Sequence, residues 1–224
     1  MAARGGALAT DFDALAECPG TTVKRHRTGD VALVAAADAP FGVALYRKRF
    51  WYPTRSDRLR GVLRTTWLAP SRVEREAKNL ERLAAWELQP ALFLAYGERR
   101  RRGFLLDSFL CTRALEARPI DELLRQERDA TRREALLESL ARFVARLHAR
   151  GFVDRDLHLR NFLATSGNEI AKIDSPFGAV VARWRRAATQ RRERDELELE
   201  LAAATNEAER SRFARAFAAA TAAS

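Results

Sequence analysis

Short apolar runs separated by turn residues occupy the first half of the chain. Runs of roughly four to eight residues, rich in branched and aromatic side chains, are typical of β-strands. The runs begin at Val31, Phe41, Ala91 and Gly103, with the sequences VALVAA, FGVALY, ALFLAYG and GFLLDSFLCT. We therefore expect a strand-rich first half, preceded by a loose leader over residues 1–19.

One helix is predicted inside this strand-rich half, over residues 71–87. It opens on Ser71 and Glu74, a capping-box pair whose side chains satisfy the first free N–H groups of a helix. At about 100° per residue, Glu76 falls inside the apolar stripe of this helix. The stripe consists of Val73, Ala77, Leu80, Leu83 and Ala84. A carboxylate turned toward a core requires a cationic partner, so we expect Glu76 to form an ion pair.

In the second half of the chain, the pattern of apolar positions changes to that of helices. A long helix is predicted after Thr131 and Glu134, a second candidate capping box, and Gly151 is a natural end for it. Its apolar side repeats at helical spacing through Leu136, Leu140, Phe143 and Leu147. The C-terminal residues indicate further helices rich in Ala, Arg and Glu, with Asn206 and Glu209 as a third candidate cap.

A β-hairpin is predicted just after the long helix. Its strands, 162–164 and 169–173, flank a Ser-Gly-Asn turn at 166–168. Strands with one inserted helix, followed mostly by helices, predict an α+β protein of two lobes. The expected boundaries are 20–115 for a strand-rich N-lobe and 116–224 for a short, mostly helical C-lobe that carries the hairpin.

The composition is that of a folded globular protein. Of the 224 residues, 47% are apolar and 31% are charged, a balance unlike that of disordered chains. No stretch approaches the roughly 20 apolar residues of a membrane span, and the N-terminus lacks the apolar core of a secretory signal, so we expect a cytoplasmic protein. The two cysteines, Cys18 and Cys111, lack disulfide or metal-ligand spacing and are expected to be free thiols.

The net charge of +10 is concentrated in two segments. Eight basic residues against one acid lie between Arg47 and Arg72, interleaved with Trp51, Tyr52 and Trp67. Six further arginines lie between Arg183 and Arg194 and indicate an exposed helix face. A basic balance favours an anionic partner. Nucleic acid is not the expected partner, because no recognised nucleic-acid-binding motif accompanies the charge.

The most informative stretch lies between the long helix and the end of the hairpin. Asp156 precedes Asn161 by five residues and Asp174 by eighteen, so that a hairpin folds the last two back toward the loop that carries the first. Phosphoryl transfer from ATP uses Mg²⁺, which takes carboxylate and amide oxygens, and a carboxylate that orients the acceptor hydroxyl. The spacing predicts Asn161 and Asp174 as metal ligands and Asp156 as the catalytic carboxylate.

The segment from Asp154 to Asn161 (DRDLHLRN) resembles the catalytic loop of the protein-kinase-like superfamily, and Ile173-Asp174 resembles the end of its metal-binding strand. His158 after Asp-Leu is closer to sugar and antibiotic kinases than to protein kinases, which usually carry Lys there. Asp154 departs from the pattern, because many relatives have His at this position. That His supports the loop, so the departure bears on loop geometry more than on chemistry.

The resemblance also implies a nucleotide site. Kinases of this superfamily hold the nucleotide phosphates with a Lys, which a helix Glu holds in turn. Of the four lysines, Lys48 follows a strand run and precedes the helix, so Lys48 and Glu76 are the predicted pair. The segment 109–114 (FLCTRA) would link the lobes, with Cys111 or Thr112 near the adenine, and Thr112 is the predicted contact.

Further segments resemble the lipopolysaccharide-core kinase family, which phosphorylates Kdo or heptose. They are Lys48-Arg49-Phe50, Arg72-x-x-x-Glu76-x-x-x-Leu80-x-x-Leu83, Ser108 to Thr112, and Arg212-Phe213-x-Arg215-Ala216-Phe217. The likeness covers roughly residues 20 to 220. It implies a sugar kinase that uses ATP and Mg²⁺, or Mn²⁺, on an anionic lipid-linked acceptor, peripheral at the cytoplasmic face of the inner membrane. The basic segment Arg47–Arg72 is the candidate contact for this acceptor or membrane.

Two other interpretations stay open at this point. A protein kinase, or a small-molecule kinase of the aminoglycoside type, would share the catalytic loop. A catalytically inactive kinase-like binding module would account for Asp154 and for the lack of an intact G-x-G-x-x-G loop. Thr28-Gly29-Asp30 is at best a shortened substitute for that loop. An active kinase is favoured by the presence of Lys48, Glu76, Asp156, Asn161 and Asp174. A measurement of turnover would separate these interpretations.

Overall fold

The computed structural model describes residues 12–52, 54 and 70–223, and it divides into two compact units. The described residues of Met1–Glu81 form one unit with Ala91–Ala114, and Arg82–Pro90 belongs with Leu115–Ser224 to the other. Strands and helices together make the chain α+β, as the sequence predicts, and all strand pairs in the described part are antiparallel.

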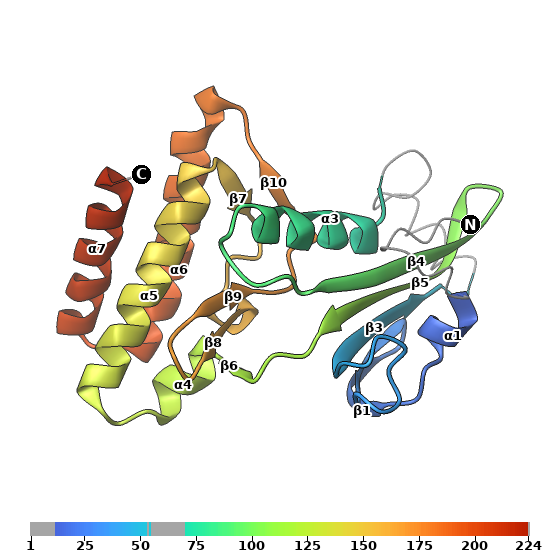
Figure 1. Cartoon of the computed structure of the whole chain (residues 1–224). Coiled ribbons are helices and arrows are strands. Elements are labelled where there is room, and N and C mark those ends of the chain that lie inside the picture. The colour runs from blue at the N-terminus through green and yellow to red at the C-terminus, as the bar shows by residue number, and fades with distance from the viewer. Residues whose placement is uncertain (1–11, 53, 55–69, 224) are drawn as a thin grey trace. The chain divides into compact units, whose positions relative to one another are not determined.

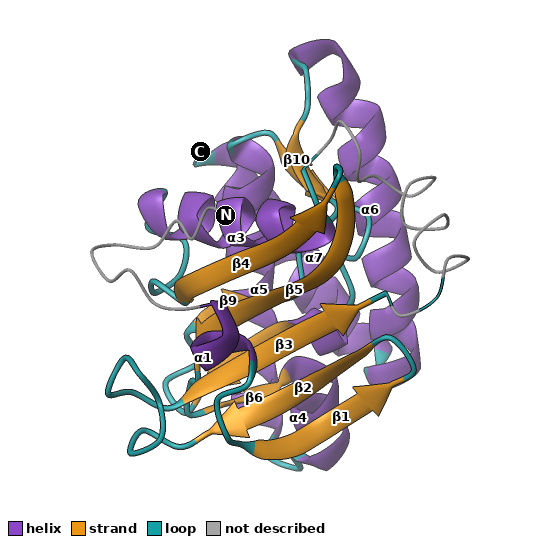
Figure 2. Cartoon of the chain, turned by 90° about the vertical axis from the view of Figure 1, so that its right-hand side faces the viewer, coloured by secondary structure: helices purple, strands orange, loops and turns teal. Residues whose placement is uncertain are grey.

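A five-stranded sheet forms the first unit (Figure 1), and its strands follow the order β1-β2-β3-β5-β4 (Figure 2). Its strands are β1 (Thr21–His26), β2 (Gly29–Val34), β3 (Leu45–Trp51), β4 (Phe93–Arg101) and β5 (Phe104–Arg113). The strand predicted from Phe41 begins only at Leu45, because a turn in which Gly42 N–H donates to the Ala39 carbonyl (3.1 Å) precedes it. The pattern of apolar residues does not reveal β1, since every side chain of this edge strand is exposed.

A short helix, α1 (Phe12–Ala16), lies over β4 and β5 on one face of this sheet (Figure 2). The Phe12 ring packs edge-on against Phe109, with 5.1 Å between the ring centres, and Leu15 is fully buried. The prediction of a loose leader is therefore wrong for residues 12–18, because their apolar side chains complete the core of the unit. Residues 1–11 lie outside the described part of the chain.

The predicted helix of the first half is α3 (Arg72–Ala85). Its start is where the sequence places it, because Ser71 Oγ accepts the N–H of Glu74 at 3.1 Å. The apolar stripe of α3 is buried except for the partly exposed Ala84. The helix crosses the boundary between the units after Glu81. Within the second unit, Leu83 and Leu88 join the hydrophobic core.

Helices dominate the second unit. They are α4 (Ile120–Gln126), α5 (Ala130–Ala149), α6 (Arg183–Ala204) and α7 (Glu207–Ala222), and α5 packs along α7 (Figure 1). The capping box of α7 at Asn206 and Glu209 is present as predicted. The predicted cap of α5 at Thr131 is wrong, because the Asp129 carboxylate accepts the N–H of Thr131 and begins the helix two residues earlier. None of the helices in the described ranges is long and apolar enough to cross a membrane.

Short strands complete the second unit around the loop that carries Asp156. They are β6 (Ala117–Pro119), β7 (Phe152–Asp154), β8 (Phe162–Thr165), β9 (Ile170–Lys172) and β10 (Gly178–Val180), with a single 3₁₀ turn at Leu159–Asn161. The predicted hairpin is confirmed, since β8 pairs with β9 in a register that sets Phe162 opposite Lys172. Gly151 has φ +71°, a left-handed conformation that ends α5 just before β7.

Candidate functional site

Lys48 lies near the middle of β3. Because successive side chains of a strand point to opposite faces of the sheet, Arg47 and Lys48 meet different partners. On one face of the sheet, Arg47 Nη1 donates to the Cys18 carbonyl at 2.6 Å. Lys48 extends to the opposite face, where its Nζ donates to Glu76 Oε1 at 2.6 Å. The ion pair predicted from the apolar stripe of α3 is therefore present.

Glu76 is almost completely buried, with an exposed fraction of 1%, whereas Lys48 keeps 17% of its side chain exposed. The second carboxylate oxygen of Glu76 has no hydrogen-bond partner among the described residues. The Lys48 ammonium is thus the group that compensates this buried charge, and it keeps enough exposure to contact an anionic ligand. That Lys48 binds nucleotide phosphates stays a prediction.

The arginines on either side of Lys48 serve the structure of the first unit. Besides its bond to Cys18, Arg47 lies 3.5 Å from an Asp30 carboxylate oxygen, and its side chain is buried. Arg49 Nη2 donates to Asp107 Oδ2 at 2.7 Å, and this hydrogen bond raises the pKa of Arg49. Most of the predicted basic segment, including Trp67, lies outside the described residues. The described arginines of β3 are therefore poor candidates for an acceptor site.

Cys111 and Thr112 are adjacent on β5 and differ in exposure. Cys111 is buried in the core of the first unit, and burial raises the pKa of its thiol to about 12. Thr112 is partly exposed, and it pairs in register with Tyr46 on one side and Phe93 on the other. Of the two candidates, Thr112 is the one with accessible surface for a ligand, and its contact with adenine stays a prediction.

The segment Thr28-Gly29-Asp30 belongs to the tight turn between β1 and β2 and to the start of β2. A Cβ atom on Gly29 would lie 2.7 Å from the Arg49 carbonyl oxygen, so the close approach of β3 accounts for this glycine. The turn is held by Trp51, whose backbone N–H donates to the Thr28 carbonyl at 3.0 Å. Strand packing explains the glycine, and it gives no support to a phosphate-binding loop.

In the second unit, the loop between β7 and β8 carries Asp156 and Asn161. The Asp156 N–H donates to Asp154 Oδ1 at 3.0 Å, and its carbonyl oxygen accepts from Asn161 Nδ2 at 2.9 Å. Its carboxylate is partly exposed and accepts no hydrogen bond within the part of the chain that the structure describes. The loop thus holds the backbone of Asp156 and leaves its carboxylate available to a substrate hydroxyl.

Asn161 is tied to the strand that precedes Asp174. Its carbonyl oxygen accepts the N–H of Ile173 at 2.9 Å, while its Nδ2 is engaged by Asp156 and leaves Oδ1 for another partner. Asp174 has φ +55°, a left-handed conformation that is costly for a residue other than glycine and is common at functional sites. An amide oxygen and a carboxylate are ligands that suit Mg²⁺. The hairpin therefore brings together the segments of both predicted metal ligands.

A metal site built here would be completed by the substrate. Among the described residues, no group of three or more His, Cys, Asp and Glu side chains gathers as a preformed metal cage. Mg²⁺ in phosphoryl-transfer sites is commonly held by one or two protein oxygens together with phosphates and water. Asn161 and Asp174 fit this kind of site.

Two glutamates of α6 stabilise the loop and the residues that precede it. Glu200 Oε1 contacts His158 Nδ1 at 2.5 Å, and its Oε2 accepts the N–H of Leu159 at 2.7 Å. Glu193 contacts His148 Nε2 at 2.9 Å, and burial raises the pKa of Glu193. Positions seven apart lie on one face of a helix. From this face of α6, Glu200 contacts the loop, while Glu193 contacts His148 of α5 and accepts the N–H of Asp154 at the end of β7.

The roles of Glu193, Glu200 and Lys172 were not predicted from the sequence. Glu193 and Glu200 share a helix face with the buried Leu197 and Leu201, and this spacing was the available signal. Lys172 is buried in β9, where it forms an ion pair with Asp154. A buried charge requires a partner of opposite charge, so a lysine inside an apolar strand requires an anion just as Glu76 requires a cation.

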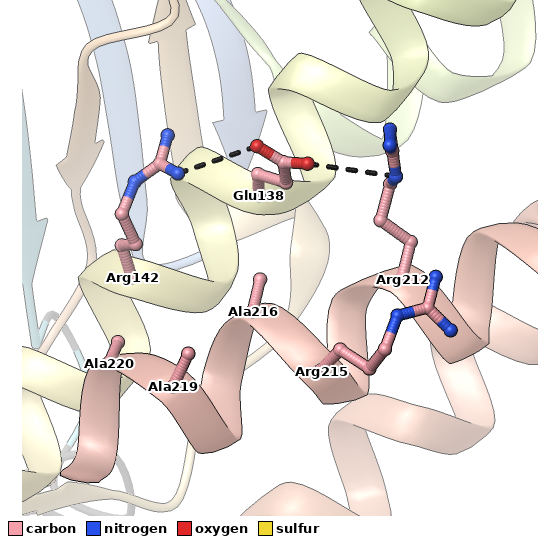
Figure 3. Close-up of a pocket in the computed structure, with 7 residues that line it drawn as sticks. All are labelled: Glu138, Arg142, Arg212, Arg215, Ala216, Ala219 and Ala220. Atoms are coloured by element: carbon pink, nitrogen blue, oxygen red, sulfur yellow. Dashed lines mark hydrogen bonds and ion pairs between the residues drawn. The ribbon is translucent and has the colours of Figure 1, made fainter.

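A hollow of about 380 Å³ lies between α5 and α7, away from the predicted site (Figure 3). It is lined by Glu138, Arg142, Arg212, Arg215, Ala216, Ala219 and Ala220. Glu138 lies 3.5 Å from Arg142 and 3.6 Å from Arg212, so it neutralises part of the positive charge. None of the predicted catalytic or metal-binding residues lines this hollow.

The geometry agrees with a comparison of the sequence with protein families. Residues 22–217 match the lipopolysaccharide kinase (Kdo/WaaP) family. No individual curated protein matches the chain. The family match includes every predicted site residue, from Lys48 to Asp174. Because the match covers most of the sequence, the chain belongs to the lipopolysaccharide kinase (Kdo/WaaP) family, whose members are phosphotransferases.

Proposed function

We propose that this kinase transfers the γ-phosphate of ATP to a hydroxyl group of Kdo or heptose in the lipopolysaccharide core. The observation that carries the proposal is the loop around Asp156. Its backbone is hydrogen-bonded on both sides, while its carboxylate accepts no hydrogen bond from the described residues. A carboxylate held in this way can orient an acceptor hydroxyl and receive its proton.

The remaining roles follow from the chemistry of each side chain. Asn161 and Asp174 would hold Mg²⁺, or Mn²⁺, which supplies positive charge to the phosphate oxygens. Lys48, compensated by Glu76, would contact the nucleotide phosphates, and Thr112 would lie near the adenine. In this proposal, the two compact units are the two lobes of a protein-kinase-like fold.

The first half of α6 is our candidate for peripheral contact with the inner membrane and its anionic lipid-linked sugar. Trp184 in the first turn of this helix has an exposed fraction of 83%, and six arginines surround it in sequence, at 183, 185, 186, 191, 192 and 194. Positive charge in the first turn of a helix opposes the helix dipole, so Arg183 and Arg185 do not stabilise α6. Arg192 and Arg194, farther along the helix, form ion pairs with Glu196 and Glu198. Basic residues beside an exposed indole suit an anionic lipid surface.

The acceptor is tested by measuring phosphate transfer from radiolabelled ATP. The panel contains a Kdo-containing lipid, a heptose-containing lipid, an aminoglycoside and a generic protein. We expect transfer to one of the two lipids. Transfer only to the protein or the aminoglycoside would contradict the proposed substrate class. Nucleotide binding without turnover of any acceptor would identify a catalytically inactive binding module.

Site variants test the assignment of roles. Asp156→Asn is expected to keep nucleotide binding and lose transfer, because the amide cannot accept the hydroxyl proton. Asp174→Asn is expected to weaken binding of the metal–nucleotide complex itself. Asp195→Asn, on the exposed side of α6, is the matched control and is expected to behave like the wild type. Wild-type transfer in both site variants would overturn the assignment.

Membrane contact is tested by flotation with vesicles that contain either anionic or only zwitterionic phospholipids. We expect the protein to float with anionic vesicles, and Trp184→Ala combined with Arg185→Gln to reduce the bound fraction. Each basic residue near an anionic surface contributes about 1 kcal/mol, so higher salt should also release the protein. Equal flotation of wild type and variant would exclude this part of α6 as the contact.

A further inference from the structure

A buried ion pair joins the start of the catalytic loop to the end of the hairpin. Lys172 Nζ lies 2.9 Å from Asp154 Oδ2, and neither side chain has exposed surface. The contact lacks hydrogen-bond geometry, so charge alone holds Oδ2, whereas Oδ1 accepts a directed bond from the backbone. Burial of two charges carries a desolvation penalty that apolar side chains of similar volume avoid. Stability alone therefore does not account for this pair.

The pair contacts both backbone polar groups of Asp156. Asp154 Oδ1 accepts the Asp156 N–H at 3.0 Å, and Lys172 Nζ donates to the Asp156 carbonyl oxygen at 3.4 Å. Lys172 Nζ also donates, at 3.4 Å, to the carbonyl oxygen of Ile173, the residue before Asp174. One ammonium group thus contacts the segment of the predicted catalytic carboxylate and the segment of a predicted metal ligand.

Other contacts anchor the pair in the core of the second unit. The backbone N–H of Lys172 donates to Gln89 Oε1 at 2.8 Å, and its Nζ lies 5.5 Å from the centre of the Phe162 ring. The backbone N–H of Asp154 donates to the buried carboxylate of Glu193 on α6. Because the groups around the pair are buried and packed, the pair is confined to one arrangement.

We propose that the Asp154–Lys172 pair positions Asp156 and Asp174 for turnover. Many relatives have a histidine in the position of Asp154. Both side chains act through the backbone of the loop, so they are positioning residues. This inference rests on the proposed function, since it takes Asp156 as the catalytic carboxylate. A displacement of about 1 Å in such a group lowers the rate about 100-fold, because the reacting atoms must lie in near-attack geometry.

Three variants of the whole chain separate positioning from simple stability. Lys172→Met keeps the length of the side chain and removes its charge. Asp154→Asn/Lys172→Met removes both charges and keeps an oxygen that can accept the Asp156 N–H. Asp154→His/Lys172→Met restores the histidine of relatives. The two double variants leave no unpaired buried charge, so they stay informative if Lys172→Met alone does not fold. Lys24→Met, exposed on β1, is the control.

The first measurement is steady-state transfer to the lipid acceptor that the wild type uses. We expect kcat to fall about 100-fold in Asp154→Asn/Lys172→Met, with the KM for ATP within about threefold of the wild type. Asp154→His/Lys172→Met is expected to recover at least about tenfold of the lost kcat. A wild-type kcat in the folded Asn/Met variant, or a higher KM with unchanged kcat, would overturn the proposal.

The second measurement does not depend on any acceptor. Amide hydrogen exchange in residues 155–158 is expected to be about tenfold faster in Asp154→Asn/Lys172→Met, while the core of α5 keeps its wild-type rates. Unchanged exchange in this loop would contradict the positioning role. If the wild type transfers phosphate to no acceptor, the proposed function fails, and the exchange data alone decide whether the pair holds the loop.

Discussion

Removal of the Lys48 ammonium tests whether the buried Lys48–Glu76 ion pair stabilises the first unit and whether Lys48 binds nucleotide. Its partner Glu76 has an exposed fraction of 1%, and Lys48 Nζ lies 2.6 Å from Glu76 Oε1. In Lys48→Met, the carboxylate would stay inside the apolar side of α3 without its cation. The charge of Glu76 would then be compensated neither by water nor by Lys48, so the variant should be strongly destabilised.

The magnitude follows from the burial of the pair. Loss of one partner from a buried ion pair costs about 3–5 kcal/mol. Lys48 retains 17% exposure, so we expect the lower end of that range, about 3 kcal/mol. In a chain of this size, each kcal/mol lowers Tm by about 2–4 °C, which gives a decrease of about 6–12 °C. Lys48→Met/Glu76→Leu removes both charges and should recover most of this loss.

Two assays on the same variants separate stability from function. Thermal unfolding followed by circular dichroism gives Tm, and titration with a fluorescent ATP analogue gives the Kd for nucleotide. We expect the double variant to regain stability but not nucleotide affinity, because the ammonium that contacts phosphate is absent in both variants. Lys78→Met is the control, since its exposed pair with Glu74 contributes about 0.3–0.5 kcal/mol.

Two results would refute this reasoning. A wild-type Tm in Lys48→Met would mean that the Glu76 carboxylate is not held in an apolar site. Recovery of nucleotide affinity in the double variant would mean that Lys48 does not contact the phosphates, whatever its structural role.

Three further predictions concern packing and ionisation. Gly97→Ala should lower Tm by several degrees, because its Cβ would lie 2.5 Å from the Phe109 ring, and overpacking costs about 1–3 kcal/mol. Cys111 should resist Ellman's reagent at pH 8 until the protein unfolds, because a pKa of about 12 leaves about one thiolate in 10,000. Arg133 lowers the pKa of Glu209 through a hydrogen bond, so the stability that Glu209 contributes is present above the unfolded pKa and lost at acid pH. Glu209→Gln should therefore lower Tm at pH 7, by the equivalent of about 2 kcal/mol, and differ less from the wild type below about pH 4.

Matched controls accompany these measurements. Gly167→Ala should leave Tm nearly unchanged, because the nearest atom to its Cβ would be 3.8 Å away. Equal melting of Gly97→Ala and Gly167→Ala would contradict the crowding argument. Rapid labelling of Cys111 in the folded protein would contradict its burial. A difference between wild type and Glu209→Gln that grows toward acid pH would contradict the sign of the pKa shift.

Local signals predicted those parts of the fold that depend on neighbours in sequence. The start of α3 at Ser71, the end of α5 before Gly151 and the capping box of α7 each involve residues within a few positions of one another. The same local patterns gave the wrong start for α5, because Asp129 caps this helix instead of Thr131. They also failed at β1, since an exposed edge strand has no apolar pattern to reveal it.

The candidate chemistry of this kinase could be predicted from the amino-acid sequence alone. The spacing of Asp156, Asn161 and Asp174 around a hairpin is a local property, and a carboxylate inside an apolar helix stripe demands a cation wherever the helix lies. Glu76 therefore predicted an ion pair, and only four lysines were available to choose from.

The contacts that hold the loop around Asp156 could not be predicted from the sequence, because they depend on the folded chain. Asp154 and Lys172 are eighteen residues apart, and Glu193 lies thirty-nine residues beyond Asp154, so no periodicity connects them. Their contacts arise because β7, β9 and α6 enclose one buried space, in which each polar group must find a partner that the fold brings to it. The residue that departs from the family pattern, Asp154, is the one whose partner only the folded chain reveals.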